Sequence, residues 1–318
     1  MKAILFADRT GSESQPLTDK TSIALLPIAA KPLIEYTLDA LLMTGIREVM
    51  VVISAFAEEI KRLLGNGERW EMQFEYVRST EQPATVLTRL GAKLSDSEYL
   101  LVRGDVLRSL NIKAFLEQAQ TLQQEQILAT IDGYNAGVCL LKTSPNSEIP
   151  PNPKIPHNLE EFEESEGVQA LAVTGNLSWL DSLKAYHQAN LAVLAGHFPS
   201  LVLPVRQVND KLQVGRRSSV PKDNAGLVGA FCRVHKKAAL LGDVVLCNEV
   251  IVDRYAKLSA TVVLPGTYIG EAVELQNAIV WGNLLIQIDT GAVEQVDDSL
   301  LLADLKAKNF NALFRDAA

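Results

Sequence analysis

A period of six residues in the second half of the chain limits its fold more than any other feature. Aliphatic residues recur every six positions, and most are followed four residues later by a small or β-branched residue. The aliphatic positions are Val214 and Val220 and then, after one slip, Val228, Val234, Leu240, Leu246, Val252, Leu258 and Leu264. This period is typical of a left-handed β-helix, in which each triangular coil takes three hexapeptides and stacked coils bury the aliphatic column. The register slips by one at Ile269 and weakens toward Ala292. The sequence therefore predicts a β-helix over residues 201–298 and a C-terminal cap or tail over 299–318.

The first 200 residues follow a different pattern, in which short apolar runs alternate with segments of helical spacing. Strands are expected at 3–7, 48–53, 74–77, 99–102, 127–131, 136–141 and 168–173. Helices are expected at 32–43, 57–64, 83–94, 110–124 and 179–194. Alternation of this kind indicates βαβ units. The fold class predicted for the whole chain is therefore α/β, a doubly wound, Rossmann-like mixed sheet over 1–200 followed by the β-helix.

Net charge, cysteine content and the length of the apolar runs indicate which partners and which cellular compartment to expect. The formal net charge is −8 and the pI is near 5.2, which argues against a nucleic-acid or anionic-membrane partner. The three cysteines, Cys139, Cys232 and Cys247, each lie in an apolar run and are expected to be buried, reduced thiols. No apolar run is long enough to span a membrane, and no leader precedes the first strand, so a cytoplasmic location is expected.

Several motifs of the first domain resemble the sugar-1-phosphate nucleotidylyltransferases. The matching stretches are Pro16-Leu17-Thr18, Leu25-Leu26-Pro27, Lys31-Pro32-Leu33-Ile34-Glu35-Tyr36 and Asn135-Ala136-Gly137-Val138. Members of that family can also carry hexapeptide coils after the catalytic domain, so the resemblance covers nearly the whole chain. It implies a reaction in which a sugar-1-phosphate attacks the α-phosphate of a nucleoside triphosphate and pyrophosphate leaves.

The resemblance also implies roles for individual residues. Asp105 would bind Mg²⁺ and, with Lys31, serve catalysis; Arg9, Gly11, Ser12, Gln82 and Gly104 would bind the nucleotide; Asn135 and Gly137 would bind the sugar. Such chemistry depends on backbone amides, cations and metal-bound carboxylates placed around the phosphates.

The sequence departs from the family pattern where the chemistry should be. Arg9 stands at a glycine of the phosphate loop, and Glu13 replaces an arginine that would meet pyrophosphate. Ile23 stands at the lysine that precedes Leu-Leu-Pro in the family pattern, and Trp179 at the second metal aspartate. Trp179 is expected in the core and Asp181 in solvent. The segment 127–137 has room for a turn but not for the family's sugar-phosphate-binding strands.

Three functions remain open from the sequence. The leading hypothesis is a catalytically impaired member of the family that serves as a regulatory or scaffolding subunit in sugar-nucleotide or exopolysaccharide metabolism. Its residual pocket would bind a nucleotide or sugar nucleotide, and its partner would be a second copy or an active paralogue. The alternative is an active transferase that uses Arg9 or Lys20 with Lys31, and Asp105 for Mg²⁺. A minor alternative is a hexapeptide acyltransferase with His235 as base.

Overall fold

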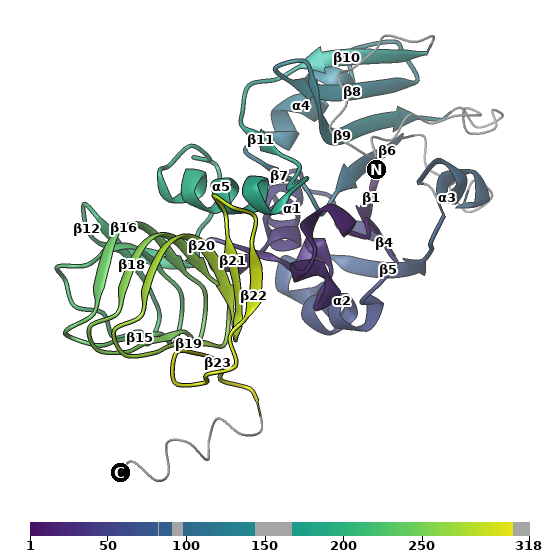
Figure 1. Ribbon diagram of the computed structural model, residues 1–318. Helices are drawn as coiled ribbons and strands as arrows, with labels where there is room; N and C mark the ends of the chain where they lie inside the picture. The colour runs from purple at the N-terminus through teal and green to yellow at the C-terminus, as the bar shows by residue number, and fades with distance from the viewer. Residues whose placement is uncertain (82, 91–97, 144–166, 308–318) are drawn as a thin grey trace. The chain divides into compact units, whose positions relative to one another are not determined.

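The computed structural model describes residues 1–81, 83–90, 98–143 and 167–307 of the chain (Figure 1). The chain divides into two compact units. The first unit contains Met1–Leu26, Pro32–Ser182 and Ser200–Val202, and the second contains Pro27–Lys31, Leu183–Pro199 and Leu203–Ala318. The domain limits of 1–200, 201–298 and 299–318 stay a prediction.

The first unit is built on a seven-stranded sheet with the strand order β10-β8-β9-β6-β1-β4-β5. These strands are β1 (Lys2–Ala7), β4 (Glu48–Ile53), β5 (Gln73–Arg78), β6 (Glu98–Arg103), β8 (Gln126–Ile131), β9 (Tyr134–Lys142) and β10 (Val168–Ala172). Strand β9 runs antiparallel to both of its neighbours, β6 and β8, and the other pairs are parallel. The sheet is therefore mixed, as predicted. Strands β8 and β9 form a hairpin, so within the segment 127–137 only Asp132 and Gly133 lie outside the two strands.

Helices cover both faces of this sheet. One apolar cluster joins the sheet to α1 (Leu33–Leu42), α2 (Ala57–Leu64) and α4 (Ile112–Ala119). A second cluster packs α3 (Pro83–Leu90) against the opposite face, which presents Ile4, Phe6 and Leu101. Successive side chains of β1 point to opposite faces of the sheet, so Leu5 packs in the first cluster and Ile4 and Phe6 pack in the second. The prediction of a doubly wound sheet is confirmed.

The second unit stacks successive coils of the chain (Figure 1). One row of parallel strands contains β14 (Ala225–Val228), β16 (Ala239–Leu246), β18 (Lys257–Val263) and β20 (Glu274–Trp281). A second parallel row contains β15 (Arg233–Val234), β17 (Ile251–Val252) and β19 (Thr267–Ile269). Leu240 pairs with Leu258, and Val234 with Val252, so three hexapeptides make one coil as predicted. Val252 pairs with Ile269, which confirms the slip by one residue. The left hand of the coil stays a prediction.

The remaining strands close the two ends of the coil stack. At its beginning, β12 (Val205–Asn209) and β13 (Leu212–Gly215) form an antiparallel pair, and β13 runs parallel to β14. After β20 the chain reverses into β21 (Leu284–Gln287) and β22 (Val293–Gln295), which are antiparallel. Strand β23 (Leu302–Asp304) then pairs antiparallel with β19. The described part of the predicted cap is therefore a strand.

The helix expected at 179–194 is shorter than predicted. Helix α5 covers Leu183–Leu194, while β11 (Leu177–Ser178) pairs with β7 (Leu107–Arg108) in the first unit. Leu180 has a φ of 53°, a left-handed conformation that does not continue a helix. Strand pairing and this backbone turn therefore delay the start of the helix.

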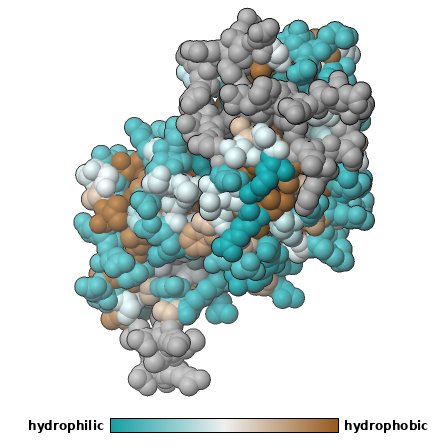
Figure 2. Space-filling view, turned by 90° about the vertical axis from the view of Figure 1, so that its right-hand side faces the viewer, coloured by the Kyte–Doolittle hydropathy of each residue, from teal (hydrophilic) through white to brown (hydrophobic). Residues whose placement is uncertain are grey.

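The surface is mostly hydrophilic on the face seen in Figure 2, with smaller groups of apolar residues between polar ones. Among the described residues, no helix has both the length and the apolar character needed to cross a membrane.

The cysteines offer a simple check on the packing of both units. Cys139, Cys232 and Cys247 are free and buried. Burial raises the pKa of Cys139 to about 12 and that of Cys232 to about 11, so the reactive thiolate is scarce at neutral pH. We expect none of the three to react with iodoacetamide at pH 8 in the native protein, and all three to react in denaturant. Mass spectrometry of the alkylated protein measures this; fast native labelling of Cys139 would contradict the burial.

Candidate functional site

The candidate site lies where two neighbouring parallel strands end. Asp8 follows β1 and Asp105 follows β6, and these strands pair directly. Gly104 donates a backbone hydrogen bond to the carbonyl oxygen of Phe6 at 2.7 Å, which extends the pairing to the carboxyl edge. Open α/β sheets bind ligands at this edge. The topology therefore places two aspartates at the ligand-binding edge of the sheet.

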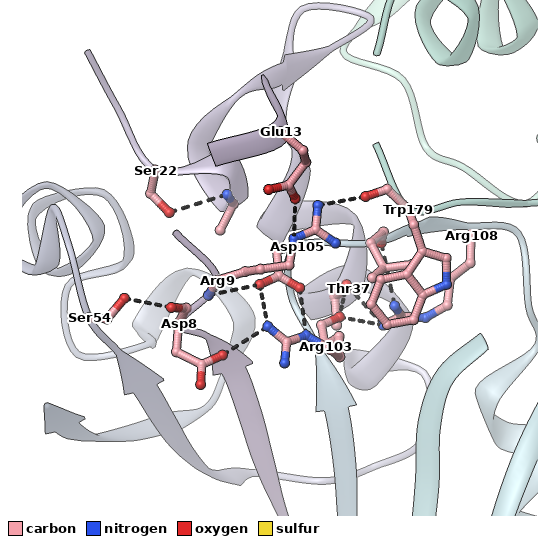
Figure 3. A network of polar contacts seen from close by, with 12 residues as sticks. Asp8, Arg9, Glu13, Ser22, Thr37, Ser54, Arg103, Asp105, Arg108 and Trp179 are labelled. Carbon is pink, nitrogen blue, oxygen red and sulfur yellow. Dashed lines mark hydrogen bonds and ion pairs between the residues drawn. The ribbon is translucent and has the colours of Figure 1, made fainter. Parts of the chain in front are cut away.

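Arg103, the last residue of β6, links these two aspartates (Figure 3). Its Nε donates to Oδ1 of Asp105 at 2.7 Å, and its Nη2 donates to Oδ2 of Asp105 at 2.6 Å. The same Nη2 lies 2.8 Å from Oδ1 of Asp8. Arg103 and Asp105 are each 0% exposed. The guanidinium thus binds one carboxylate through two hydrogen bonds and reaches the second, the geometry that planar Arg–carboxylate pairs favour.

The charges of this cluster depend on one another. Burial by itself would raise the pKa of Asp105, but the Arg103 guanidinium and its hydrogen bonds outweigh burial and hold that pKa below its ordinary value. For Asp8 burial prevails over the attraction of Arg103, and the nearby Asp105 charge adds to it, so the pKa of Asp8 is raised. Burial opposes the charge of Arg103 as well, yet the two aspartates raise its pKa. Asp105 is therefore the firmly ionised partner of the buried arginine.

This arrangement does not fit a bound Mg²⁺. Magnesium takes oxygen ligands in a nearly octahedral shell and needs carboxylate oxygens that are free to face it. Both oxygens of Asp105 already accept hydrogen bonds from a cation, and Oδ2 lies 3.4 Å from the backbone nitrogen of Arg9 as well. The described residues contain no group of three or more His, Cys, Asp or Glu side chains that could hold a metal. Asp105 is the predicted Mg²⁺ ligand, and the guanidinium of Arg103 competes with Mg²⁺ for its two oxygens.

The loop that is predicted to bind phosphate, residues 9–13, is fixed by contacts within the first unit. Gly11 has a φ of 72°, and a Cβ at this position would lie 2.8 Å from Cγ2 of Thr18. The hydroxyl of Thr18 donates to the carbonyl oxygen of Gly11 at 2.7 Å. Ser14 donates to the carbonyl oxygen of Leu180 at 3.0 Å, whereas Ser12 is exposed. The one glycine of the family pattern that survives is therefore the one that this turn requires.

Arg9 points along the loop and is paired within the protein. Its Nε lies 3.1 Å from Oε1 of Glu13, and its Nη2 donates to the carbonyl oxygen of Trp179 at 2.6 Å. Its guanidinium carbon lies 5.6 Å from the centroid of the Trp179 ring. Trp179 is buried and Asp181 is exposed, which confirms both predictions. Arg9, at a glycine position of the family pattern, thus contacts both Glu13, at an arginine position, and Trp179, at an aspartate position.

The two predicted sugar-binding residues, on β9, also have internal roles. Asn135 accepts a hydrogen bond from the backbone nitrogen of Gly137 at 2.8 Å, and its carbonyl oxygen accepts one from Nε1 of Trp179 at 2.9 Å. Gly137 has a φ of 68°, and a Cβ there would lie 3.2 Å from Cβ of Arg103. A glycine at this position therefore leaves room for the arginine.

Arg108 contacts the cluster through the backbone of Arg103. Its Nη2 donates to the carbonyl oxygen of Arg103 at 2.8 Å and to the hydroxyl of Thr37 on α1 at 3.1 Å. Burial lowers the pKa of Arg108 to about 10. No carboxylate of the described residues lies within ion-pair distance of it.

The remaining predicted site residues are Lys31, Gln82 and Gly104. Lys31 lies in β3 (Lys31–Pro32), and its segment, Pro27–Lys31, belongs to the second unit. There Tyr186 donates to the carbonyl oxygen of Pro27 at 2.6 Å, and Asn190 accepts from the nitrogen of Ala29 at 2.9 Å. Gln82 lies outside the described residues. Gly104 is placed at the sheet edge, and its missing Cβ leaves space beside Ile34.

Sequence reasoning missed Asp8 and Arg103. An arginine at the end of the apolar run Tyr99–Val102 was a usable signal, because a charge in a buried strand needs a partner. The partner was hidden because Asp8 lies 95 residues away and meets Arg103 only through the order of the strands.

Comparisons with known proteins agree with this architecture. Residues 2–137 match the model of the nucleotidyl transferase family. A glucose-1-phosphate thymidylyltransferase of Actinoplanes sp. is 40% identical over 24% of this chain and 25% of its own length. An N-acetylmuramate alpha-1-phosphate uridylyltransferase of Neisseria meningitidis is 31% identical over 39% of this chain and 55% of its own. The chain thus spans a quarter and about half of these two relatives.

A longer match covers both units. A UTP–glucose-1-phosphate uridylyltransferase of Synechocystis sp. is 21% identical over 95% of this chain and 92% of its own length. Together with the fold and the sheet-edge site, these matches support a relationship of the chain to the sugar-1-phosphate nucleotidyltransferases.

Proposed function

We propose that this chain is a catalytically silent member of its family that acts as a regulatory or scaffolding subunit in sugar-nucleotide metabolism. The observation that carries the proposal is the Arg103 guanidinium, bound to both oxygens of Asp105 and to Asp8. In the family, the aspartate of this motif is expected to hold Mg²⁺ beside the triphosphate. Here a side-chain cation occupies its oxygens, and dislodging it would leave a buried charge unpaired.

The loop supports the same proposal. A phosphate loop works by presenting free donors and positive charge to a polyanion. Arg9 is instead neutralised by Glu13 and bonded to Trp179, and Glu13 adds a negative charge where pyrophosphate would leave. Loss of one preorganised donor typically lowers a rate by about a hundredfold to a thousandfold. Several such losses together favour a chain that does not turn over.

The ligand that a silent subunit would sense is proposed from its relatives. Those named above transfer uridylyl or thymidylyl groups, so uridine and thymidine nucleotides and their sugar conjugates are the first candidates. A second copy of this chain or an active paralogue would be the partner. The active-transferase alternative needs Arg9 or Asp105 to be released from its internal pairs, and the acyltransferase alternative gains no specific support from the coils.

Pyrophosphate release tests the proposal directly. We expect no release above background when the purified protein is mixed with Mg²⁺, each common nucleoside triphosphate or dTTP, and a panel of hexose-1-phosphates. Asp105→Asn is the matched control, since it keeps the shape of the side chain and removes its charge. Turnover in the native protein that Asp105→Asn abolishes would refute the proposal. An active relative assayed in parallel shows that the reagents work, and circular dichroism shows that both proteins are folded.

A regulatory role has its own measurement. Titration of this chain into an active paralogue is expected to change the paralogue's kcat or KM, and nucleotide binding by calorimetry is expected to identify the effector. If the kcat and KM of the paralogue stay unchanged and no nucleotide binds, the proposed regulatory role is wrong.

A further inference from the structure

The cations of the second unit are concentrated in its first coils. Residues 216–237 contain six lysines and arginines and one acidic residue, Asp223, in a chain whose formal net charge is −8. All six cations are exposed, namely Arg216, Arg217, Lys222, Arg233, Lys236 and Lys237. The average charge of the chain therefore hides a local surface of the opposite sign.

Coil stacking brings five of these cations together. Arg233 lies in β15 with its side chain exposed, next to the buried Val234, and it pairs with Ser219 of the preceding coil. The nitrogen of Phe231 donates to the carbonyl oxygen of Arg216 at 3.0 Å. We call this surface the basic face; its residues are Arg216, Arg217, Phe231, Arg233, Lys236, Lys237 and Tyr255.

Within the described part of the chain, these cations have no carboxylate partners, in contrast to those of the following coil. Arg254 lies 2.6 Å from Glu271, and Lys257 lies 2.7 Å from Glu274. Among the described residues, none of the five cations of the basic face forms an ion pair. Their charge is consequently available to an outside partner.

Two aromatic side chains are exposed among these cations. Phe231 is 40% exposed and Tyr255 is 47% exposed. The guanidinium carbons of Arg216 and Arg217 lie 5.3 and 5.8 Å from the Phe231 ring centroid, and Nζ of Lys237 lies 5.0 Å from that of Tyr255. Bases of nucleic acids stack on free ring faces, whereas the Phe231 ring is flanked by two guanidinium groups and Nζ of Lys237 donates to the Tyr255 hydroxyl at 2.8 Å. Aromatic rings flanked by lysine and arginine suit the interface of an anionic membrane, where charged headgroups cover apolar acyl chains.

We propose that the basic face docks on an anionic phospholipid membrane, with its five cations at the headgroups and Phe231 entering the interface. Each lysine or arginine near such a surface contributes about 1 kcal/mol, which corresponds to about a fivefold change in partitioning. The interaction is peripheral, and it weakens as salt screens the charges.

Vesicle flotation of the full chain tests this proposal. Vesicles of phosphatidylcholine alone are compared with equimolar phosphatidylcholine and phosphatidylglycerol, at low and high salt. We expect binding only to the anionic vesicles and only at low salt. The double substitution Arg233→Gln/Lys236→Gln removes two cations that hold neither aromatic ring, and it is expected to weaken partitioning by about 25-fold. Phe231→Asn, which suits the φ of 59° at this position, is expected to weaken it several-fold.

Arg47→Gln/Lys61→Gln is the matched control, because it changes the net charge equally at one exposed and one partly exposed residue of the first unit. It is expected to bind as the native chain does. Equal loss of binding in the control and in the basic-face variant would overturn the proposal, as would absence of binding to anionic vesicles. Tighter binding to heparin or single-stranded DNA than to vesicles, lost in Arg233→Gln/Lys236→Gln, would also overturn it and assign the face to a soluble polyanion.

Discussion

Replacing Arg103 by Met is expected to destabilise the first unit by about 3–5 kcal/mol at neutral pH. The substitution keeps most of the side-chain volume but leaves the carboxylates of Asp8 and Asp105 buried beside each other without their common cation. Denaturant unfolding followed by circular dichroism measures the change in the free energy of unfolding. A variant as stable as the native protein would contradict the role given to Arg103.

The pH dependence of this loss has a definite sign. In the native protein the pKa of Asp105 is depressed, so its contribution to stability is present above the unfolded-state pKa of about 3.9 and is lost as the pH falls below it. In Arg103→Met the two buried carboxylates repel each other, so their pKa values should rise and the protonated forms should be favoured. The deficit of the variant is therefore expected to shrink as the pH is lowered from 7 toward about 4.

Two control variants test whether the loss of stability in Arg103→Met comes from leaving buried carboxylates without their cation. Arg89→Met removes an exposed pair with Glu81 and is expected to change stability by no more than about 1 kcal/mol. Asp8→Leu/Arg103→Met/Asp105→Leu removes the whole charged cluster, and replacement of buried ion clusters by apolar residues is often neutral or stabilising. The triple variant is thus expected to be more stable than Arg103→Met alone.

A second large loss is expected for Leu258→Ala, at about 2–5 kcal/mol. Leu258 lies in β18 between Leu240 and Leu275 of the adjacent coils and is 0% exposed. Its truncation removes buried apolar surface and leaves a cavity in the column that holds the coils together. Because each coil contacts only its neighbours, the effect should be strongest near β16, β18 and β20. Hydrogen exchange is expected to show faster exchange in these strands than in β1 and β4.

The same change at an exposed position provides the comparison. Leu241 is 63% exposed in β16, and Leu241→Ala is expected to change the free energy of unfolding by about 0.5 kcal/mol or less. Equal losses at both positions would show that the column does not carry the stability of the coils.

The sequence predicted the parts of the fold that depend on local repetition. The period of six specifies which residues face inward in every coil, and the apolar runs of the first half specify the strands of the mixed sheet. The start of α5 was wrong because β11 and the left-handed Leu180 precede it, and neither follows from helical spacing. Strand order, by contrast, came only with the structure.

The candidate site was predicted less completely for a physical reason. The losses at Glu13 and Trp179 could be read by matching motifs, but the pairing of Arg103 with Asp8 and Asp105 requires knowing that β1 and β6 are neighbours. Net charge also says nothing about the arrangement of charges on the surface. A chain-wide value of −8 cannot describe the basic face, because coil stacking gathers cations that the sum cancels against distant acids.

The pairing of Leu240 with Leu258 and of Val234 with Val252 makes one coil a natural unit of length for this protein. A deletion or duplication of one whole coil returns every side chain to its own column, whereas a shift of one residue turns buried positions outward. Evolution can therefore lengthen or shorten the second unit in whole coils without redesigning its interior. Related chains are expected to differ there in coil number far more readily than in coil composition.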